Sequence, residues 1–138
     1  MDVRAALFRG NDLLLVQERS DGGWTLPGGW ADPNESPSEC VIKEVKEESG
    51  YQVRPVKLAA VFDRSKHPHE PPFASHLYKM FFLCEIVGGA PAATLETYGC
   101  EFFSENALPP LSLTRITHGQ IARIFEHHRH PELPADFD

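Results

Sequence analysis

Three glutamates, Glu44, Glu47 and Glu48, lie at helical spacing in this chain of 138 residues. At about 100° per residue, their side chains project along one side of a helix. Glu44 and Glu48 form a like-charge i,i+4 pair, which costs roughly 0.2–0.5 kcal/mol. A divalent cation bound by the carboxylates would remove that cost, since hard cations take oxygen ligands. The simpler interpretation is a solvated acidic face, which is usual for acidic helices. The flanking residues are therefore needed to distinguish a metal site from such a face.

The segment that carries these glutamates has sequence signals for both ends of a helix. Ser36 and Glu39 form a Ser-x-x-Glu capping box, and Pro37 suits the first helical position. Gly50 stands where a left-handed residue is favoured at the end of a helix. We therefore expect a helix between Ser36 and Gly50. Its predicted apolar stripe comprises Val41, Ile42 and Val45.

A double glycine, Gly28-Gly29, precedes this helix and permits a close approach of backbone to a ligand. The whole stretch resembles the Nudix box: Gly, five residues, Glu, seven residues, Arg-Glu-apolar-x-Glu-Glu-x-Gly-apolar. The residues in register with it are Gly29, Glu35, Glu44, Val45, Glu47, Glu48 and Gly50. Two positions depart from it, because Lys43 replaces the arginine and Tyr51 is partly polar. Matches at such fixed spacing are far more specific than a lone glycine motif.

The resemblance implies a metal-dependent hydrolase. Hydrolysis of a phosphoric anhydride needs neutralised oxygens, a positioned water and a stabilised leaving phosphate, and Mg²⁺ or Mn²⁺ can supply all three. By the resemblance, the metal ligands are Glu47 and Glu48 together with the carbonyl of Gly29. Glu44 would ligate a second ion or orient the water. We expect these residues to form the catalytic centre.

Structural support for the centre is implied at four further positions. By the resemblance, Glu35 holds Lys43 and keeps the loop and the helix in register. Arginine grips a carboxylate with a planar fork, whereas lysine is a point charge. We therefore expect looser support of the glutamates, but not a loss of activity. Gly28 allows the loop to approach closely, and Gly50 ends the helix.

Candidates for substrate contacts lie outside the box. Nudix enzymes commonly recruit a further carboxylate, and Glu101 and Glu96 are the candidates here, although either could be an ordinary exposed acid. The Pro-rich loop 67–72 could close over a substrate. Beside it, Arg64, Lys66 and His67 could meet a terminal phosphate. A solvated surface loop is an equally good interpretation.

Aromatic side chains could stack on a base. Trp30 is the best candidate because it adjoins the double glycine. For Trp24, Phe73 and Tyr78, packing in the core or at the rim is the simpler interpretation.

The end of the chain has its own helix signal, a capping box formed by Thr117 and Gln120. Three histidines follow near the end of that helix, and their types invite a metal-binding interpretation. Without a capped site, we interpret them as incidental surface histidines. They are His127, His128 and His130. The polar tail from Pro131 is expected to be loose.

Apolar runs separated by turn residues predict the strands. The runs span residues 3–8, 13–16, 24–26, 53–64, 75–87 and 100–104. Pro55 implies an edge or an irregularity in its strand. Strands before, between and after two helices predict one α/β domain with a mixed sheet. The resemblance sharpens this prediction to a Nudix α/β/α sandwich over residues 1–138.

Composition restricts the partners. The net charge of −7 argues against a nucleic acid polymer or a membrane surface. It is compatible with a small phosphorylated substrate, because a bound metal inverts the local field. The three cysteines are odd in number and lack metal-ligand spacing, so we expect reduced thiols. With no signal peptide or 18-residue apolar stretch, a cytoplasmic location is expected.

Several stretches beyond the box resemble a bacterial Nudix subgroup of ADP-ribose or CDP-choline pyrophosphatases. They are WTLPGGWAD, DRSKH, LYKMFFLCEIVGG and LPPLS. Many of these relatives carry a small N-terminal domain that this sequence lacks, and a homodimer is plausible by the resemblance. We expect metal-activated water to cleave a nucleoside diphosphate linked to a moiety X. The alternatives are a sanitising hydrolase for oxidised nucleoside triphosphates and a non-hydrolysing nucleotide sensor, which the intact glutamates oppose.

Overall fold

The computed structural model describes residues 1–70 and 77–138. Its strands are β1 (Asp2–Arg9), β2 (Asp12–Glu18), β3 (Trp24–Thr25), β4 (Gly28–Trp30), β5 (Tyr51–Asp63), β6 (Tyr78–Gly89), β7 (Thr97–Phe103) and β8 (Asp136–Phe137). Its helices are α1 (Pro37–Ser49) and α2 (His118–Arg129), with short 3₁₀ turns η1 (Arg64–Lys66) and η2 (Glu105–Ala107). Neither α1 nor α2 is long and apolar enough to cross a membrane.

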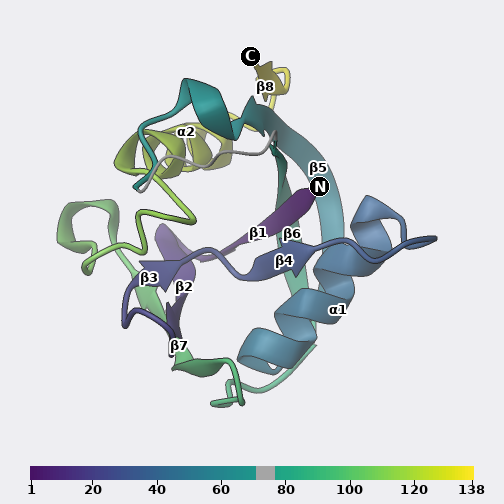
Figure 1. Cartoon of the computed structure of the whole chain (residues 1–138), viewed down its shortest axis with the longest axis vertical. Coiled ribbons are helices and arrows are strands. Elements are labelled where there is room, and N and C mark those ends of the chain that lie inside the picture. Colours follow the sequence, from purple (N-terminus) through teal and green to yellow (C-terminus); the bar gives the residue numbers. More distant parts are fainter. Residues whose placement is uncertain (71–76) are drawn as a thin grey trace.

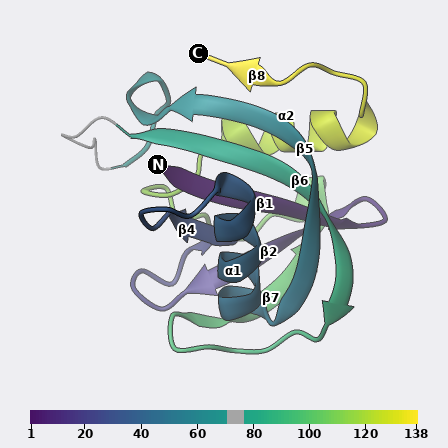
Figure 2. The same ribbon diagram turned by 90° about the vertical axis from the view of Figure 1, so that its right-hand side faces the viewer.

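The strands form a mixed sheet in the order β3-β2-β1-β6-β5-β8, with β4 paired to β1 and β7 paired to β2. The β1–β6 and β5–β8 pairs are parallel, whereas β1–β2 and β5–β6 are antiparallel. Helices α1 and α2 lie on opposite sides of the strands (Figure 1), and Figure 2 shows α1 in front of them with α2 behind. The predicted α/β/α arrangement with a mixed sheet is therefore confirmed.

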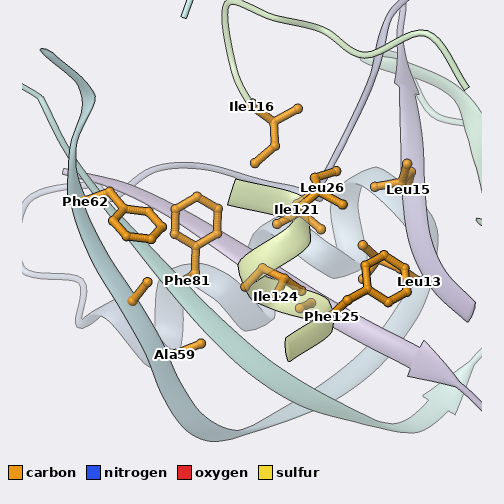
Figure 3. Packing of buried hydrophobic residues seen from close by; sticks show 12 residues of the cluster. Leu13, Leu15, Leu26, Ala59, Phe62, Phe81, Ile116, Ile121, Ile124 and Phe125 are labelled. Carbon is orange, nitrogen blue, oxygen red and sulfur yellow. The ribbon is translucent and has the colours of Figure 1, made fainter. Parts of the chain in front are cut away.

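Alternation along β1 explains the two hydrophobic layers, because successive side chains of a strand point to opposite faces. Val3, Ala5 and Leu7 belong to the cluster that includes Val41 and Val45 of α1. The intervening Ala6 belongs to the second cluster, on the α2 side. That cluster includes Leu13, Leu15, Phe62, Phe81, Ile121, Ile124 and Phe125 (Figure 3).

Both predicted ends of α1 are confirmed. The Ser36 hydroxyl accepts a hydrogen bond from Glu39 N, and the Glu39 carboxylate accepts one from Ser36 N. At the other end, Gly50 adopts φ 86° and donates its N–H to the carbonyl of Lys46. One detail of the stripe was wrong. Ile42 is exposed and Cys40 is buried, because Ile42 lies about 100° around the helix from Val41, off the packed face.

The C-terminal end differs from the prediction. The capping box of Thr117 and Gln120 is present, but His127 is fully buried and is not a surface histidine. Its Nδ1 lies 3.0 Å from Lys57 Nζ, and its Nε2 lies 3.2 Å from Asp136 Oδ1. The tail is not loose, because β8 pairs with β5. Both errors have one cause: β5 is distant in sequence, and local patterns carry no information about it.

Strand boundaries also shift by a few residues. β5 begins at Tyr51, and its register with β6 changes between Pro55 and Lys57, as proline predicts. β7 begins at Thr97, three residues earlier than expected. The predicted strand at 75–87 begins at Tyr78 in the described chain. Its first two residues, part of the 67–72 loop, and Phe73 lie outside the described residues.

Candidate active site

Three carboxylates converge at one end of α1. Oxygen atoms of Glu44, Glu48 and Glu96 all lie within 4.8 Å of one another. The first two come from successive turns of α1, whereas Glu96 comes from the turn that leads into β7. The hydroxyl of Thr97 donates a 2.8 Å hydrogen bond to the Glu48 carbonyl, which ties that turn to α1. Glu96, one of two candidates from outside the box, thereby joins the two helix residues.

Glu48 is the most buried member of this cluster, with 3% of its surface exposed. Its Oε2 accepts a 2.8 Å hydrogen bond from Gly28 N. Burial raises the pKa of Glu48 to about 8, even though Arg4 and the Gly28 N–H favour the ionised form. The carboxylate is thus held in place while its charge is only weakly compensated, which suits a cation ligand.

Both glycines of the loop lie close to neighbouring atoms, and only Gly28 meets backbone that cannot give way. A Cβ at Gly29 would lie 3.0 Å from the carboxylate of Glu44. A Cβ at Gly28 would lie 2.0 Å from the carbonyl oxygen of Val3, a distance that no side chain can occupy. The loop therefore packs directly against β1 and α1. Burial, and then Glu47, raise the pKa of Glu44.

Lys43, on α1, contacts two carboxylates of the loop that precedes the helix. Its Nζ lies 2.8 Å from Glu35 Oε2 and 2.8 Å from Asp32 Oδ2. Glu35 Oε1 also accepts a 3.1 Å hydrogen bond from Asp32 N. The lysine contacts the glutamate expected from the motif and a second carboxylate that the sequence analysis missed. Hydrogen bonds to Asp32 and Glu35 raise the pKa of Lys43.

A pocket of about 330 Å³ surrounds the three carboxylates. Its lining residues are Arg4, Glu18, Gly28, Gly29, Trp30, Glu44, Glu48, Glu96 and Arg115. Arg4, Glu18 and Arg115 were not predicted. A weak sequence signal existed for Arg4, which is a charged residue inside the apolar run 3–8, whereas Glu18 lies two residues beyond the run 13–16. Arg115 precedes the last helix, and nothing in its local sequence marks it.

Other predicted residues are not brought into this cluster. Glu47 is exposed, outside the group of three. Glu101 is exposed on β7 and pairs with Leu15, whose side chain packs on the α2 side of the sheet. Lys66 is exposed on η1. His67 Nε2 lies 2.9 Å from Asp138 Oδ2, so the tail holds this histidine.

One further candidate, Trp30, lines the pocket, another, Arg64, lines an adjoining pocket, and the neighbouring His69 differs from expectation. Trp30 is 57% exposed at the pocket rim, where a planar ring could meet a base. Arg64 is buried and lines an adjoining pocket. His69, assigned to a surface loop, is buried as well. Burial, with Lys79 and Arg64 nearby, lowers the pKa of His69 to about 4.

The donor set fits a hard divalent cation. Carboxylate oxygens are the ligands that Mg²⁺ and Mn²⁺ prefer. Three of them converge here, and burial raises the pKa of Glu44 and Glu48 although Arg4 lies nearby. Bringing carboxylates together in a poorly solvated place is unfavourable without positive charge. The arrangement can therefore hold a metal ion beside a bound phosphate.

Comparison with known proteins identifies similar chains. The NUDIX domain family matches residues 1–124. The chain is 47% identical over 137 residues to "Putative ADP-ribose pyrophosphatase YjhB" of Bacillus subtilis, covering 99% of this chain and 65% of that protein. It is 30% identical over 113 residues to an ADP-ribose pyrophosphatase of Methanocaldococcus jannaschii, covering 80% of this chain and 64% of that one. The chain thus spans less than two thirds of the length of these relatives.

Two solved structures of diphosphate-cleaving enzymes are also similar to this chain. A crystal structure of an ADP-ribose pyrophosphatase from Streptococcus suis superposes with a TM-score of 0.89 at 41% identity, covering 99% of this chain and 97% of that chain. A UDP-X diphosphatase superposes with a TM-score of 0.90 at 30% identity, covering 100% of this chain and 66% of that chain.

Proposed function

Because this chain belongs to the Nudix family, we propose that it is a Mg²⁺- or Mn²⁺-dependent pyrophosphohydrolase for a nucleoside diphosphate linked to X. The observation that carries the proposal is the convergence of Glu44, Glu48 and Glu96 beside the double glycine. ADP-ribose is the first substrate to test, because the similar proteins above include ADP-ribose pyrophosphatases. A UDP-linked compound is the second.

Glu44, Glu48 and Glu96, whose oxygen atoms converge, would hold the cation, and the Gly29 carbonyl at the pocket wall would be a further oxygen donor. When bound, the cation supplies charge neutralisation for the phosphoryl oxygens and lowers the pKa of a bound water. Glu48 is fixed by the Gly28 N–H, so it anchors the set. Lys43, with Glu35 and Asp32, keeps the loop against the helix.

Arginines at the pocket wall meet the charge of the diphosphate. Arg4 and Arg115 line the pocket together with the acids, and their guanidinium groups suit phosphoryl oxygens. Glu47 lies between Glu44 and Glu48 in α1 and is exposed, outside the group of three carboxylates, so its role as a metal ligand stays a prediction. Trp30 would stack on the base, which its exposed ring at the pocket lining supports.

A hydrolysis panel tests the activity. ADP-ribose, a UDP-sugar, CDP-choline and 8-oxo-dGTP are each incubated with Mg²⁺, with Mn²⁺ and with chelator, and released phosphate monoesters are measured. We expect turnover of a diphosphate-linked compound in metal and none in chelator. A preference for 8-oxo-dGTP would instead support the sanitising function, and a Bacillus subtilis protein named "Putative 8-oxo-dGTP diphosphatase" is 36% identical to this chain over 104 residues.

Glu48→Gln separates an enzyme from a nucleotide sensor. The substitution keeps the size of the side chain and removes its charge, so we expect turnover to fall by at least about 10²-fold, the scale of one lost electrostatic contact in a transition state. A sensor would show no turnover in either form. Glu39→Gln, at the exposed start of α1, is the matched control and should retain activity.

A further inference from the structure

Glu96 differs from Glu44 and Glu48 in that it does not belong to α1, so its position depends on the segment between β6 and β7. Both main-chain groups of Glu96 are hydrogen-bonded. Its N–H donates to Thr94 Oγ1 at 3.2 Å, and its carbonyl accepts from Arg19 N at 3.0 Å. Arg19 Nε also donates to the Thr94 carbonyl at 3.0 Å. The backbone that carries this carboxylate is therefore fixed, although Glu96 itself is exposed.

Two threonine hydroxyls link the main chain of Glu96 to the main chain of Glu48. Thr97 Oγ1 donates to the Glu48 carbonyl at 2.8 Å, and a carbonyl can only accept. Because this bond uses the single hydroxyl proton of Thr97, Thr94 is the donor in the 3.1 Å contact between Thr94 Oγ1 and Thr97 Oγ1. Thr94 Oγ1 in turn accepts from Glu96 N. Three hydrogen bonds in one direction therefore run from the Glu96 N–H to the Glu48 carbonyl.

This link lies where the segment between β6 and β7 runs past the end of α1 (Figure 2). The last four carbonyls of a helix have no partner within the helix, and two of those of α1 are bonded to this segment. Glu48 O accepts from Thr97 Oγ1, and Ser49 O accepts from Ala92 N at 2.9 Å. Thr97 is fully buried, and a buried polar group without a partner is unfavourable. The segment is therefore held against the helix from which Glu48 projects.

We propose that Thr97 is a positioning residue, which acts through Thr94 to fix where the Glu96 carboxylate meets the cation. Oxygen atoms of Glu44, Glu48 and Glu96 lie within 4.8 Å of one another, and neutral hydroxyls hold this spacing without offsetting the charge of the acids. A lysine or arginine in their place would pair with the carboxylates and oppose the cation. Contacts that orient metal ligands typically change metal affinity by roughly 10–100-fold. The inference rests on the proposed function for the cation, but not for the substrate.

Thr97→Val tests the proposal, because valine has nearly the shape of threonine and lacks its hydroxyl. We expect Mn²⁺ to bind about tenfold more weakly, the lower end for lost supporting contacts at metal sites, measured by calorimetry without substrate. Thr97→Ser keeps the hydroxyl and should bind Mn²⁺ as the wild type does. Thr25→Val is the matched control and should also bind as the wild type does. Thr25 is likewise fully buried, and its hydroxyl has no hydrogen-bond partner among the described residues.

A double variant separates positioning from a general loss of structure. If Thr97 acts through Glu96, Thr97→Val should weaken Mn²⁺ binding far less in a Glu96→Gln protein, because both changes remove the same contribution. An equal loss in both backgrounds would overturn the inference, as would wild-type affinity in Thr97→Val. Thr94→Val, at a partly buried position, is the second variant if Thr97→Val does not fold. It should show the same loss of affinity and the same dependence on Glu96.

The inference and the proposed function fail separately in these experiments. Mn²⁺ binding that depends on Thr97, without hydrolysis of any diphosphate compound, would refute the proposed function alone. Hydrolysis by the wild type, together with full Mn²⁺ affinity in Thr97→Val, would refute the inference alone. Wild-type protein that binds no Mn²⁺ would overturn both.

Discussion

Gly28 donates its backbone N–H to Glu48 Oε2 at 2.8 Å, across 20 positions of the chain. This bond joins the glycine loop to the last turn of α1 and fixes a carboxylate whose surface is almost wholly buried. Glu48 is therefore positioned before any ligand binds, and a cation completes its environment. The consequences of this contact, and of those around it, can be measured.

Added metal should reduce the loss of stability that is expected as the pH rises. The pKa of Glu48 is about 8 in the folded protein, above its ordinary value of 4.5. The contribution of Glu48 to the free energy of unfolding is fully present below pH 4.5 and is lost as the pH rises through 8. Over this range the carboxyl ionises freely only in the unfolded state. We expect the melting temperature in chelator to fall over this range and added Mg²⁺ to reduce the fall. Glu48→Gln should lack the metal-dependent difference, and equal pH slopes for both proteins would contradict this account.

Gly28→Ala should damage both stability and activity. The added Cβ would lie 2.0 Å from the Val3 carbonyl oxygen, so β4 must move away from β1. We expect a loss of about 3 kcal/mol in the free energy of unfolding, at the upper end for overpacking, measured by urea denaturation. Gly10→Ala is the control, since its Cβ meets nothing within 4 Å. Its positive φ alone should cost about 1–2 kcal/mol, with activity retained.

Lys43→Arg should leave kcat/KM equal or higher. The lysine already contacts Glu35 and Asp32, and a guanidinium could hold the same two carboxylates with more hydrogen bonds. Lys43→Met removes both contacts and should lower kcat/KM by about tenfold, as for lost supporting contacts at metal sites. Steady-state kinetics with the preferred substrate checks both. A large fall for the arginine variant would show that lysine has a role of its own.

Glu96 and Glu101 can be compared directly, because both were candidates and only Glu96 reaches the cluster. Glu96→Gln should weaken Mn²⁺ binding and lower turnover by about 10²-fold. Glu101→Gln, on an exposed position of β7, should change both by less than about twofold. Calorimetry with Mn²⁺ and a hydrolysis assay measure the two effects. The reverse order would place the outer carboxylate at Glu101.

Local chemistry explains what could be predicted from the residues alone. The ends of α1 followed from Ser36, Glu39 and Gly50, because capping is settled within a few residues. Spacing on a helix likewise predicted that Glu44, Glu47 and Glu48 share a side, and of these the structure brings Glu44 and Glu48 together, whereas Glu47 is exposed. The order of the strands and helices predicted the mixed sheet. The motif around α1 predicted the family and the hydrolase class.

Tertiary structure decided the partners of those residues. Asp2, Arg4 and Lys79 form one buried ion cluster, although Lys79 is 77 residues from Asp2 in sequence. The parallel pairing of β1 with β6 places them side by side, and no local pattern specifies that pairing. The choice of Glu96 over Glu101 and the burial of His127 arise in the same way. The sequence by itself determined which side chains α1 presents, and only the folded sheet determined what faces them, because pairing of distant strands depends on the whole core.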